Sequence, residues 1–421
     1  MIEKTVFKNG LRAVFYPMKD TRAVTLLVLI ATGSRQETKE ENGISHFLEH
    51  SFFKGTKNRP SMLDIAKELD AVGGIYNAFT SKEVTGFWVK VNGRHAAVAF
   101  DVLSDMLFNP LLSAKELEKE KRVIYEEINM IEDDPQHYIL EVWENLLYGN
   151  QPSGRPIIGT KKSLAGISRN DLARRIAKHF VAENAVIALA GDFKKEEAML
   201  WVKKYFSGFG KNKPLVNEPT KEKQNQPKMI IRFKKTGQTH LCLGVRTFNL
   251  FHPDKYVLAV TASLLGGSMS SRLFSEVREK RGLSYYVHTI PQEYTDTGYL
   301  VTHAGVDTKR VEEAIVVILN EYKKIKTRKV PLSELTKVKD NIKGKIMLGL
   351  ETSDSWAGYI GEQEIFKGKV STPEQECAKI DEVSQEDIFR VAQEIFVPEK
   401  LNLAIIGPFK NKTAFEKKLT I

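Results

Sequence analysis

An internal repeat constrains the fold of this 421-residue chain more than any other feature. Residues 167–193 align with residues 383–409 without a gap. Ile167 matches Val383, an offset of 383 − 167 = 216. The same offset relates Asp171 to Asp387, Phe180 to Phe396, Gly191 to Gly407 and Phe193 to Phe409. A constant offset over the whole block indicates a duplicated domain.

Each copy of the repeat predicts a serine-capped amphipathic helix, an apolar strand, a glycine-containing turn and a further helix. We therefore expect two homologous domains, at residues 1–207 and 229–421. The segment between them, 208–228, is rich in Gly, Pro, Asn, Gln and Lys, which is typical of an exposed linker.

The first half alternates strand and helix patterns. Asn9-Gly10 predicts a hairpin turn between two short strands, at residues 5–7 and 12–17. Further strands are expected at 24–31, 75–80 and 85–91, and helices at 61–71, 94–108 and 113–131. The fold class that follows is α+β, with two domains that are each a mostly antiparallel sheet with helices packed on one face.

The sequence composition indicates where the protein is located and which side chains can bind a metal. The first ten residues contain no apolar targeting segment, and the longest mainly apolar run, 23–31, is too short to cross a bilayer. We expect a soluble, cytoplasmic protein with no membrane partner. The two cysteines, Cys242 and Cys377, are too few and too far apart for a disulfide framework, so they are expected to be buried thiols. Any metal site must use histidine and carboxylate.

The formal net charge of +10 raises the question of nucleic-acid binding. Basic residues are interleaved with acidic ones through most of the chain, as on ordinary solvated surfaces. The basic stretches at 119–122 and 221–235 are not joined to an aromatic RNA-binding signature. We therefore expect no nucleic-acid partner.

One pentapeptide, residues 46–50, carries the clearest chemistry. It reads His-Phe-Leu-Glu-His, the inverted zinc-protease motif H-x-x-E-H. His46 and His50 are four residues apart, so on a helix both imidazoles can reach one metal ion. Glu49 lies on the same face and can act as general base toward a water activated by the metal. Catalytic zinc usually takes three protein ligands, so one ligand must come from elsewhere.

The acid-rich helix expected at 113–131 can supply that ligand. Its glutamates are Glu116, Glu118, Glu120, Glu126 and Glu127. Spacing alone does not choose among them. Glu120 and Glu127 are seven apart and share one stripe, so a ligand with a second carboxylate beside it is geometrically reasonable.

A family resemblance emerges from four motifs together. They are His46-Phe-Leu-Glu-His50, Phe53-Lys-Gly-Thr56, Tyr76-Asn-Ala-Phe-Thr-Ser81 and Val123-Ile-Tyr-Glu-Glu-Ile128. With the duplication, they resemble the pitrilysin family of inverted-motif zinc peptidases over nearly the whole chain. Within that family, the sequence is most similar to the mitochondrial processing peptidase β subunit and its bacterial relatives.

The resemblance implies a role for each motif residue. His46, His50 and Glu127 would bind one Zn²⁺ per chain, and Glu49 would be the general base. Glu126 is the adjacent alternative to Glu127 as the third ligand. The resemblance also implies that Glu120 supports the site as a neighbouring carboxylate.

Substrate-binding residues are implied in both halves. Asn77, Ala78, Phe79 and Thr80 resemble the family's edge strand, onto which an extended peptide adds through main-chain hydrogen bonds. The second half lacks its own H-x-x-E-H motif. Its Arg278 and Tyr285 resemble an Arg and a Tyr that reach the substrate, Tyr285 as an oxyanion donor. The adjacent Tyr286 is the alternative.

The expected function is zinc-dependent hydrolysis of peptide bonds in unfolded or extended peptides. The resemblance also implies a homodimer, or a heterodimer with a related subunit. A non-catalytic partner or scaffold subunit is the main alternative, because the family includes members that keep the fold and lose the metal. A zinc hydrolase acting on a non-peptide bond is a third hypothesis.

Overall fold

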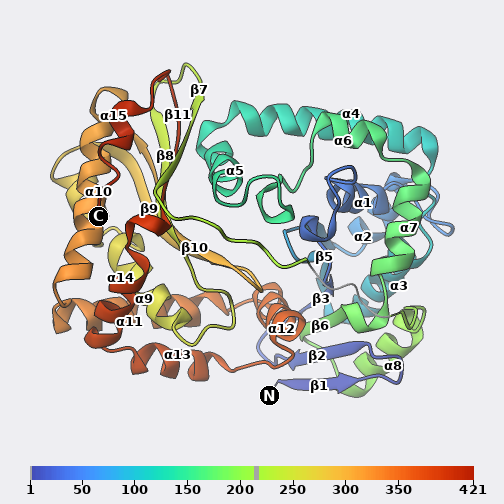
Figure 1. Ribbon diagram of the computed structural model, residues 1–421. Coiled ribbons are helices and arrows are strands. Elements are labelled where there is room, and N and C mark those ends of the chain that lie inside the picture. The colour runs from blue at the N-terminus through green and yellow to red at the C-terminus, as the bar shows by residue number, and fades with distance from the viewer. Residues whose placement is uncertain (1, 213–217) are drawn as a thin grey trace. The chain divides into compact units, whose positions relative to one another are not determined.

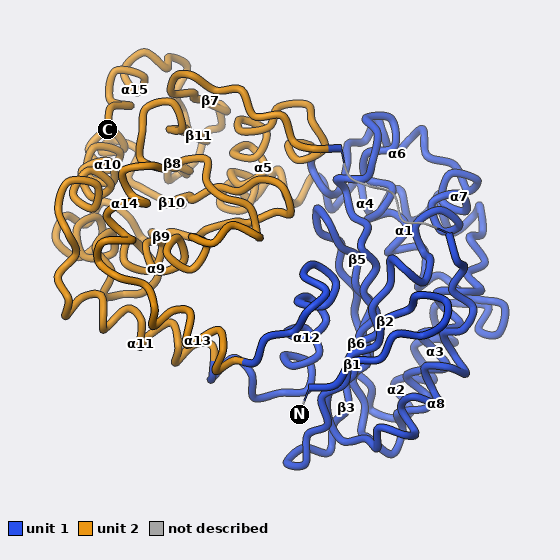
Figure 2. Tube along the Cα trace, turned by 60° about the horizontal axis from the view of Figure 1, so that its bottom comes forward, with its two compact units in different colours: residues 1–128, 156–218, 347–372 blue, residues 129–155, 219–346, 373–421 orange. Residues whose placement is uncertain are grey.

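The computed structural model describes residues 2–212 and 218–421, and its contacts divide the chain into two compact units (Figure 2). Unit 1 comprises residues 1–128, 156–218 and 347–372, and unit 2 comprises 129–155, 219–346 and 373–421. Of the linker predicted at 208–228, residues 213–217 lie outside the described residues.

The units differ from the linear division at 207 and 229 because two segments are exchanged. Residues 129–155, from the first half of the chain, belong to unit 2, and residues 347–372, from the second half, belong to unit 1. Each exchanged segment carries a long helix, α5 (Pro135–Tyr148) or α12 (Ser353–Lys367). The offset of 216 relates residues 135–148 to 351–364, which overlap α12, so the two copies exchange equivalent helices.

Unit 1 is built on a sheet in the order β1-β2-β6-β3-β5-β4. All of these strands except β4 are labelled in Figure 1. Neighbouring strands are antiparallel except for β2 and β6, which are parallel. The strands are β1 (Glu3–Val6), β2 (Arg12–Pro17), β3 (Ala23–Ile30), β4 (Ile75–Thr80), β5 (Thr85–Asn92) and β6 (Ala185–Gly191). All but the first residue of β3 is buried, as expected for a strand with both faces covered.

Helices from the first half of the chain pack against this sheet. α3 packs against β5 and α8, and α8 contacts β2, while α1 lies beside β4. The helices are α1 (Ile44–Phe52), α2 (Met62–Asp70), α3 (Ala96–Phe108), α6 (Lys161–Gly166), α7 (Arg169–His179), α8 (Lys195–Phe206) and α4 (Ala114–Asp133), whose residues from 129 on belong to unit 2.

The exchanged helix α12 covers the other face, against β2, β3 and β6. Trp356 stacks on Tyr16 with ring centroids 3.8 Å apart, and Ile360 is fully buried against the sheet. A Cβ at Gly361 would lie 2.9 Å from Leu29 and 3.1 Å from Ala188, so glycine lets the helix approach the sheet closely.

Unit 2 repeats this plan with a sheet in the order β7-β11-β8-β10-β9. Only the β7–β11 pair is parallel among these described strands. The exchanged helix α5 packs on β7, β8 and β11, and helices of the second half pack with the opposite face. The strands are β7 (Lys228–Phe233), β8 (Thr239–Thr247), β9 (Ser284–Glu293), β10 (Gly298–Val306) and β11 (Leu401–Gly407). The helices are α9 (Lys255–Gly266), α10 (Val311–Thr327), α11 (Leu332–Gly349), α13 (Pro373–Glu382), α14 (Gln385–Ile395) and α15 (Thr413–Glu416).

The repeated block corresponds to matched elements in the two units. Helix α7 and strand β6 have bounds 216 residues before those of α14 and β11, since 385 − 169 = 216 and 401 − 185 = 216. Ser168 caps α7 and Ser384 caps α14, each with an aspartate three residues later that completes a capping box. The predicted α+β class with two homologous, mostly antiparallel domains is confirmed, with one exchanged helix added to the second face of each sheet.

None of the helices in residues 2–212 and 218–421 is both long and apolar enough to span a lipid bilayer.

Candidate metal centre

The H-x-x-E-H motif lies on helix α1, whose start is fixed by a buried carboxylate. Gly43 precedes the helix at φ = 95°, and a Cβ there would lie 2.6 Å from the Ile158 carbonyl oxygen. The Glu37 carboxylate accepts hydrogen bonds from the backbone N–H groups of Gly43 (2.8 Å) and Ser45 (2.9 Å). These are free donors at the start of the helix, so Glu37 satisfies them and favours the helix dipole.

A buried arginine holds the same end of α1. Arg175 on α7 donates to Ser45 Oγ (2.9 Å), to the Gly33 carbonyl oxygen (3.0 Å) and to Thr32 Oγ1 (3.0 Å). Burial raises the pKa of Glu37, and the positive charge of Arg175 opposes this rise. Arg175 therefore joins the start of the motif helix to α7.

Three side chains converge where α1 faces α4. The distance from His46 Nε2 to Glu127 Oε1 is 3.6 Å, and that from His50 Nε2 to Glu127 Oε2 is also 3.6 Å. The ligand atoms of these residues all lie within 4.8 Å of one another, and within the described parts of the chain no other set of His, Cys, Asp or Glu meets this condition. Glu126 is exposed and is not in the group, so the geometry favours Glu127 over Glu126.

The chemistry of this set fits a divalent transition metal. Burial, with a smaller contribution from His50, lowers the pKa of His46 to about 3, so its imidazole is neutral and has a lone pair to donate at neutral pH. Burial raises the pKa of Glu127, while His50 opposes this effect. Two imidazole nitrogens and one carboxylate are a donor set typical of catalytic zinc, which keeps a fourth position open.

Glu49 lies beside this group and contacts the neighbouring strand. Thr80, the last residue of β4, donates a hydrogen bond of 2.6 Å to Glu49 Oε2. Burial raises the pKa of Glu49, and the hydrogen bond from Thr80 opposes the rise. The hydrogen bond orients the carboxylate, and partial burial brings its proton affinity closer to that useful for a general base.

Strand β4 is the edge of its sheet. It pairs with β5, and no strand among the described residues pairs with its other side. Asn77 is exposed, and its side-chain oxygen accepts a hydrogen bond of 2.9 Å from the Ala78 N–H. Phe79 is half-buried. Residues 77–80 therefore form an open edge whose last residue touches Glu49.

The two histidines differ in their support. His50 Nδ1 donates a hydrogen bond of 3.1 Å to Glu120 Oε1, and Lys54 Nζ lies 2.6 Å from Glu120 Oε2. Although burial alone would raise it, the contacts with His50 and Lys54 lower the pKa of Glu120. His46 Nδ1 is buried and has no hydrogen-bond partner within the described residues. Glu120, the carboxylate predicted to support the site, therefore contacts His50.

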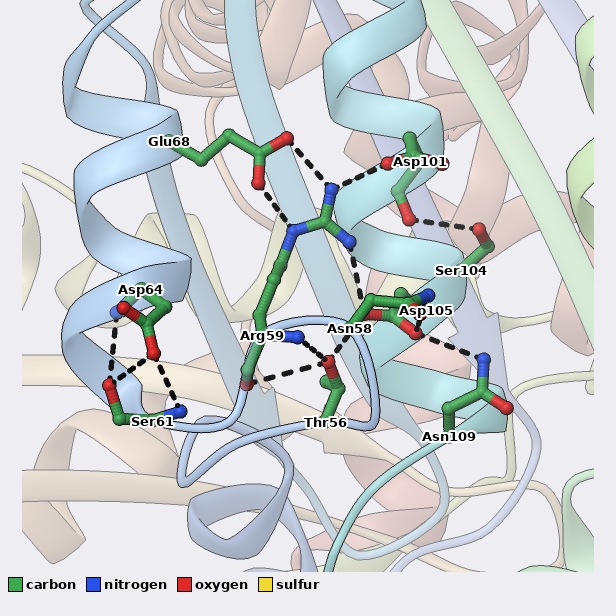
Figure 3. Close-up of polar contacts among 10 residues, drawn as sticks. All are labelled: Thr56, Asn58, Arg59, Ser61, Asp64, Glu68, Asp101, Ser104, Asp105 and Asn109. Carbon is green, nitrogen blue, oxygen red and sulfur yellow. Dashed lines mark hydrogen bonds and ion pairs between the residues drawn. The ribbon is translucent and has the colours of Figure 1, made fainter.

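An arginine anchors the loop that follows α1 (Figure 3). The Arg59 guanidinium binds Glu68 through two hydrogen bonds of 2.6 and 2.8 Å, and it contacts Asp101 (2.5 Å) and Asp105 (2.9 Å). Thr56 also donates to Asp105. This network joins the loop that follows the motif helix to α2 and α3.

Arg278 and Tyr285 belong to unit 2, whereas the motif helix α1 belongs to unit 1. Arg278 belongs to a π-helical turn, Phe274–Glu279, and donates a hydrogen bond of 2.6 Å to the Tyr285 carbonyl oxygen. Tyr285 is 73% exposed, whereas the hydroxyl of Tyr286 is hydrogen-bonded to two histidines. Of these two tyrosines, Tyr285 therefore has the available hydroxyl. Its role toward a substrate stays a prediction.

Sequence reasoning missed the residues that position α1 and the loop after it. Glu37, Arg175 and Arg59 lie outside the motifs, and no local spacing marks them. Lys54 lies within the motif Phe53-Lys-Gly-Thr56, but its contact with Glu120 depends on α4 packing beside α1. Each of these roles arises from a contact between distant segments.

Two family models match the chain. The model described as insulinase (peptidase family M16) matches residues 13–161, and the one described as peptidase M16 inactive domain matches residues 166–342. The first match contains the whole candidate metal group.

Full-length relatives carry similar names. A Bacillus subtilis protein, YmxG, is 37% identical over 98% of this chain and 99% of its own length, and it is named an uncharacterized zinc protease. A Mycobacterium leprae protein with the same description is 32% identical over 99% of this chain and 94% of its own length.

Solved structures share the fold. A protease from Helicobacter pylori has a TM-score of 0.89 at 23% identity, covering 97% of this chain and 99% of that chain. A chain of complex III from Candida albicans has a TM-score of 0.88 at 18% identity, with complete coverage of both chains. These two likenesses show that the fold is shared.

Proposed function

Because the chain belongs to peptidase family M16, the pitrilysin family of zinc metallopeptidases, we propose that it is a zinc-dependent endopeptidase that cleaves unfolded or extended peptides. The observation that carries the proposal is the convergence of His46, His50 and Glu127 within 4.8 Å of one another, with Glu49 on the same helix.

His46, His50 and Glu127 would hold one zinc ion per chain. When bound, zinc supplies Lewis-acid polarisation of the scissile carbonyl and of a water molecule. Glu49 takes the proton of that water as it attacks the carbonyl carbon, and then delivers the proton to the leaving amine nitrogen. Glu120 positions His50 through the hydrogen bond to Nδ1.

The open edge of β4 supports the choice of substrate class. A peptide that adds to residues 77–80 in an extended conformation would pair with main-chain groups, which requires an unfolded segment and reads little of its sequence. Thr80 links this edge to Glu49. We extend the proposal to Arg278 and Tyr285, with Tyr285 donating to the oxyanion, as the family resemblance implies.

Cleavage of internally quenched peptides tests the proposal. We expect turnover by the purified protein, loss of turnover on chelation, recovery on adding zinc, and loss in Glu49→Gln with zinc content unchanged. Turnover that survives both chelation and Glu49→Gln would contradict the mechanism. Absence of stoichiometric zinc would favour the alternative of a non-catalytic partner subunit, and a full zinc site without peptide cleavage would favour a non-peptide substrate.

We also propose that the chain works in the cytoplasm as a pair, either as a homodimer or with a related subunit. Light scattering of the purified chain at micromolar concentration tests the homodimer, and a monomer would require the related subunit or a single-chain enzyme.

A further inference from the structure

Strand β9 contains a bulge at Tyr285. Gly305 of β10 pairs with Tyr286, whereas the next residue, Val306, pairs with Ser284, so Tyr285 is left out of the ladder. A bulge of this kind inserts one extra residue and redirects its side chain. The exposed position of Tyr285 follows from this irregularity.

Arg278 binds the backbone carbonyl oxygen of Tyr285, the residue at the bulge. Its Nη1 donates to the Tyr285 oxygen at 2.6 Å, and its guanidinium carbon lies 5.1 Å from the centre of the Tyr285 ring. The same guanidinium lies 4.9 Å from the ring of Phe274. Arg278 thus supports the backbone and ring of Tyr285 from one side.

Tyr286, the next residue of β9, anchors the strand through its hydroxyl. Its hydroxyl lies 2.9 Å from His240 Nδ1 on β8 and 3.0 Å from His303 Nε2 on β10. A phenolic hydroxyl can donate one hydrogen bond and accept another, so two neutral imidazoles satisfy it completely. A Cβ at Gly305 would lie 2.4 Å from the Tyr286 ring, so glycine is needed for the ring to cross β10.

The two imidazoles are held neutral and oriented. Burial lowers the pKa of His303 to about 4 and also lowers the pKa of His240. The backbone of Gln136, at the start of the exchanged helix α5, partly opposes the lowering of the His303 pKa. The Tyr286 hydroxyl therefore connects three strands, β8, β9 and β10.

We propose that Tyr286, His240 and His303 are positioning residues that hold the β9 bulge and keep the Tyr285 hydroxyl turned outward for a bound peptide. This inference rests on the proposed function, because it assigns Tyr285 to the reaction. It also gives Arg278 a second role, since its guanidinium supports Tyr285 in addition to its proposed contact with the substrate. A substitution of Tyr286 should then change kcat only because it displaces the Tyr285 hydroxyl.

Steady-state kinetics of single and double variants test this dependence. Tyr285→Phe is expected to lower kcat by about 100-fold, as for loss of an oxyanion donor, and Tyr286→Phe by about tenfold with KM changed less than about twofold. The double variant should have the kcat of Tyr285→Phe alone. A kcat for Tyr286→Phe equal to wild type, or reductions that multiply in the double variant, would overturn the proposal.

Hydrogen exchange followed by mass spectrometry tests the anchor without any activity. Tyr286→Phe should speed exchange of the peptide covering 283–290 by roughly fivefold or more, because a buried hydrogen-bonded tie is lost. Tyr256→Phe is the matched control, since Tyr256 is half-buried in unit 2 and its hydroxyl donates one bond of 2.9 Å to Glu376. Unchanged exchange in Tyr286→Phe would refute the anchor even if the protein were no peptidase.

Discussion

Glu120 accepts a hydrogen bond of 3.1 Å from His50 Nδ1, and this contact sets one histidine of the candidate metal centre apart from the other. His46 Nδ1 has no corresponding partner among the described residues. A carboxylate behind a metal-binding histidine fixes the tautomer that leaves Nε2 free and strengthens its donation to the metal. The pair should therefore contribute to zinc affinity without touching zinc.

Glu120→Gln should weaken zinc binding by about 10–100-fold. Competition with a chelator of known affinity measures the change. Glu118→Gln is the control, because Glu118 is on the same helix and its side chain is 69% exposed, where it contacts Lys121. Equal zinc affinities for the two variants would show that the Glu120 contact is incidental.

Glu127→Gln should abolish stoichiometric zinc binding, whereas Glu126→Gln should retain it. A neutral amide is a much poorer zinc ligand than a carboxylate, and only Glu127 belongs to the converging group. Elemental analysis after dialysis gives the zinc content of each variant. The reverse result would reassign the third ligand to Glu126.

Arg59→Met should lower the free energy of unfolding by about 3–5 kcal/mol, because it leaves the buried carboxylate of Asp105 without its cation. Urea denaturation measures the loss. Arg310→Met removes an exposed ion pair with Glu313 and should cost less than about 1 kcal/mol. Similar losses in both variants would mean that the Arg59 network is no stronger than a surface pair.

Trp356→Ala should destabilise unit 1 by about 3–5 kcal/mol although the residue comes from the second half of the chain. Its ring stacks on Tyr16 of β2 and is 9% exposed. Hydrogen exchange in β2, β3 and β6 should accelerate. Leu348→Ala, at a side chain that is 72% exposed, provides the control, and it should leave exchange in these strands unchanged.

The metal-free protein should lose stability as the pH falls below about 6.5. Burial lowers the pKa of His179 to about 3, so the unfolded chain binds a proton at this position more readily than the folded chain. The contribution of His179 is complete above the unfolded pKa and is lost as the pH falls toward the folded value. Urea denaturation between pH 7 and pH 4 should show a shallower loss in His179→Asn than in the half-exposed control His95→Asn.

Local patterns predicted individual elements well. The expected strands at 12–17 and 75–80 match β2 and β4 at both ends, and the serine caps of the repeat begin α7 and α14. Side-chain periodicity, turn dipeptides and caps act within a few residues, so the sequence displays them directly. The exchange of α5 and α12 leaves no such trace, because a helix with an apolar face can cover either of two similar sheets.

The sequence by itself determined the duplication, the α+β class, and a helix that presents two histidines and a glutamate on one side. It also restricted the third ligand to one acidic helix and, through the family resemblance, to two adjacent glutamates. Only the tertiary structure decided that Glu127 converges on the histidines while Glu126 is exposed, and that Tyr286 is anchored while Tyr285 is free. Two adjacent residues of the same type have nearly the same spacing from any motif, so the sequence does not distinguish them. They differ in which side of a helix or strand they occupy, and the packing of distant segments sets that orientation.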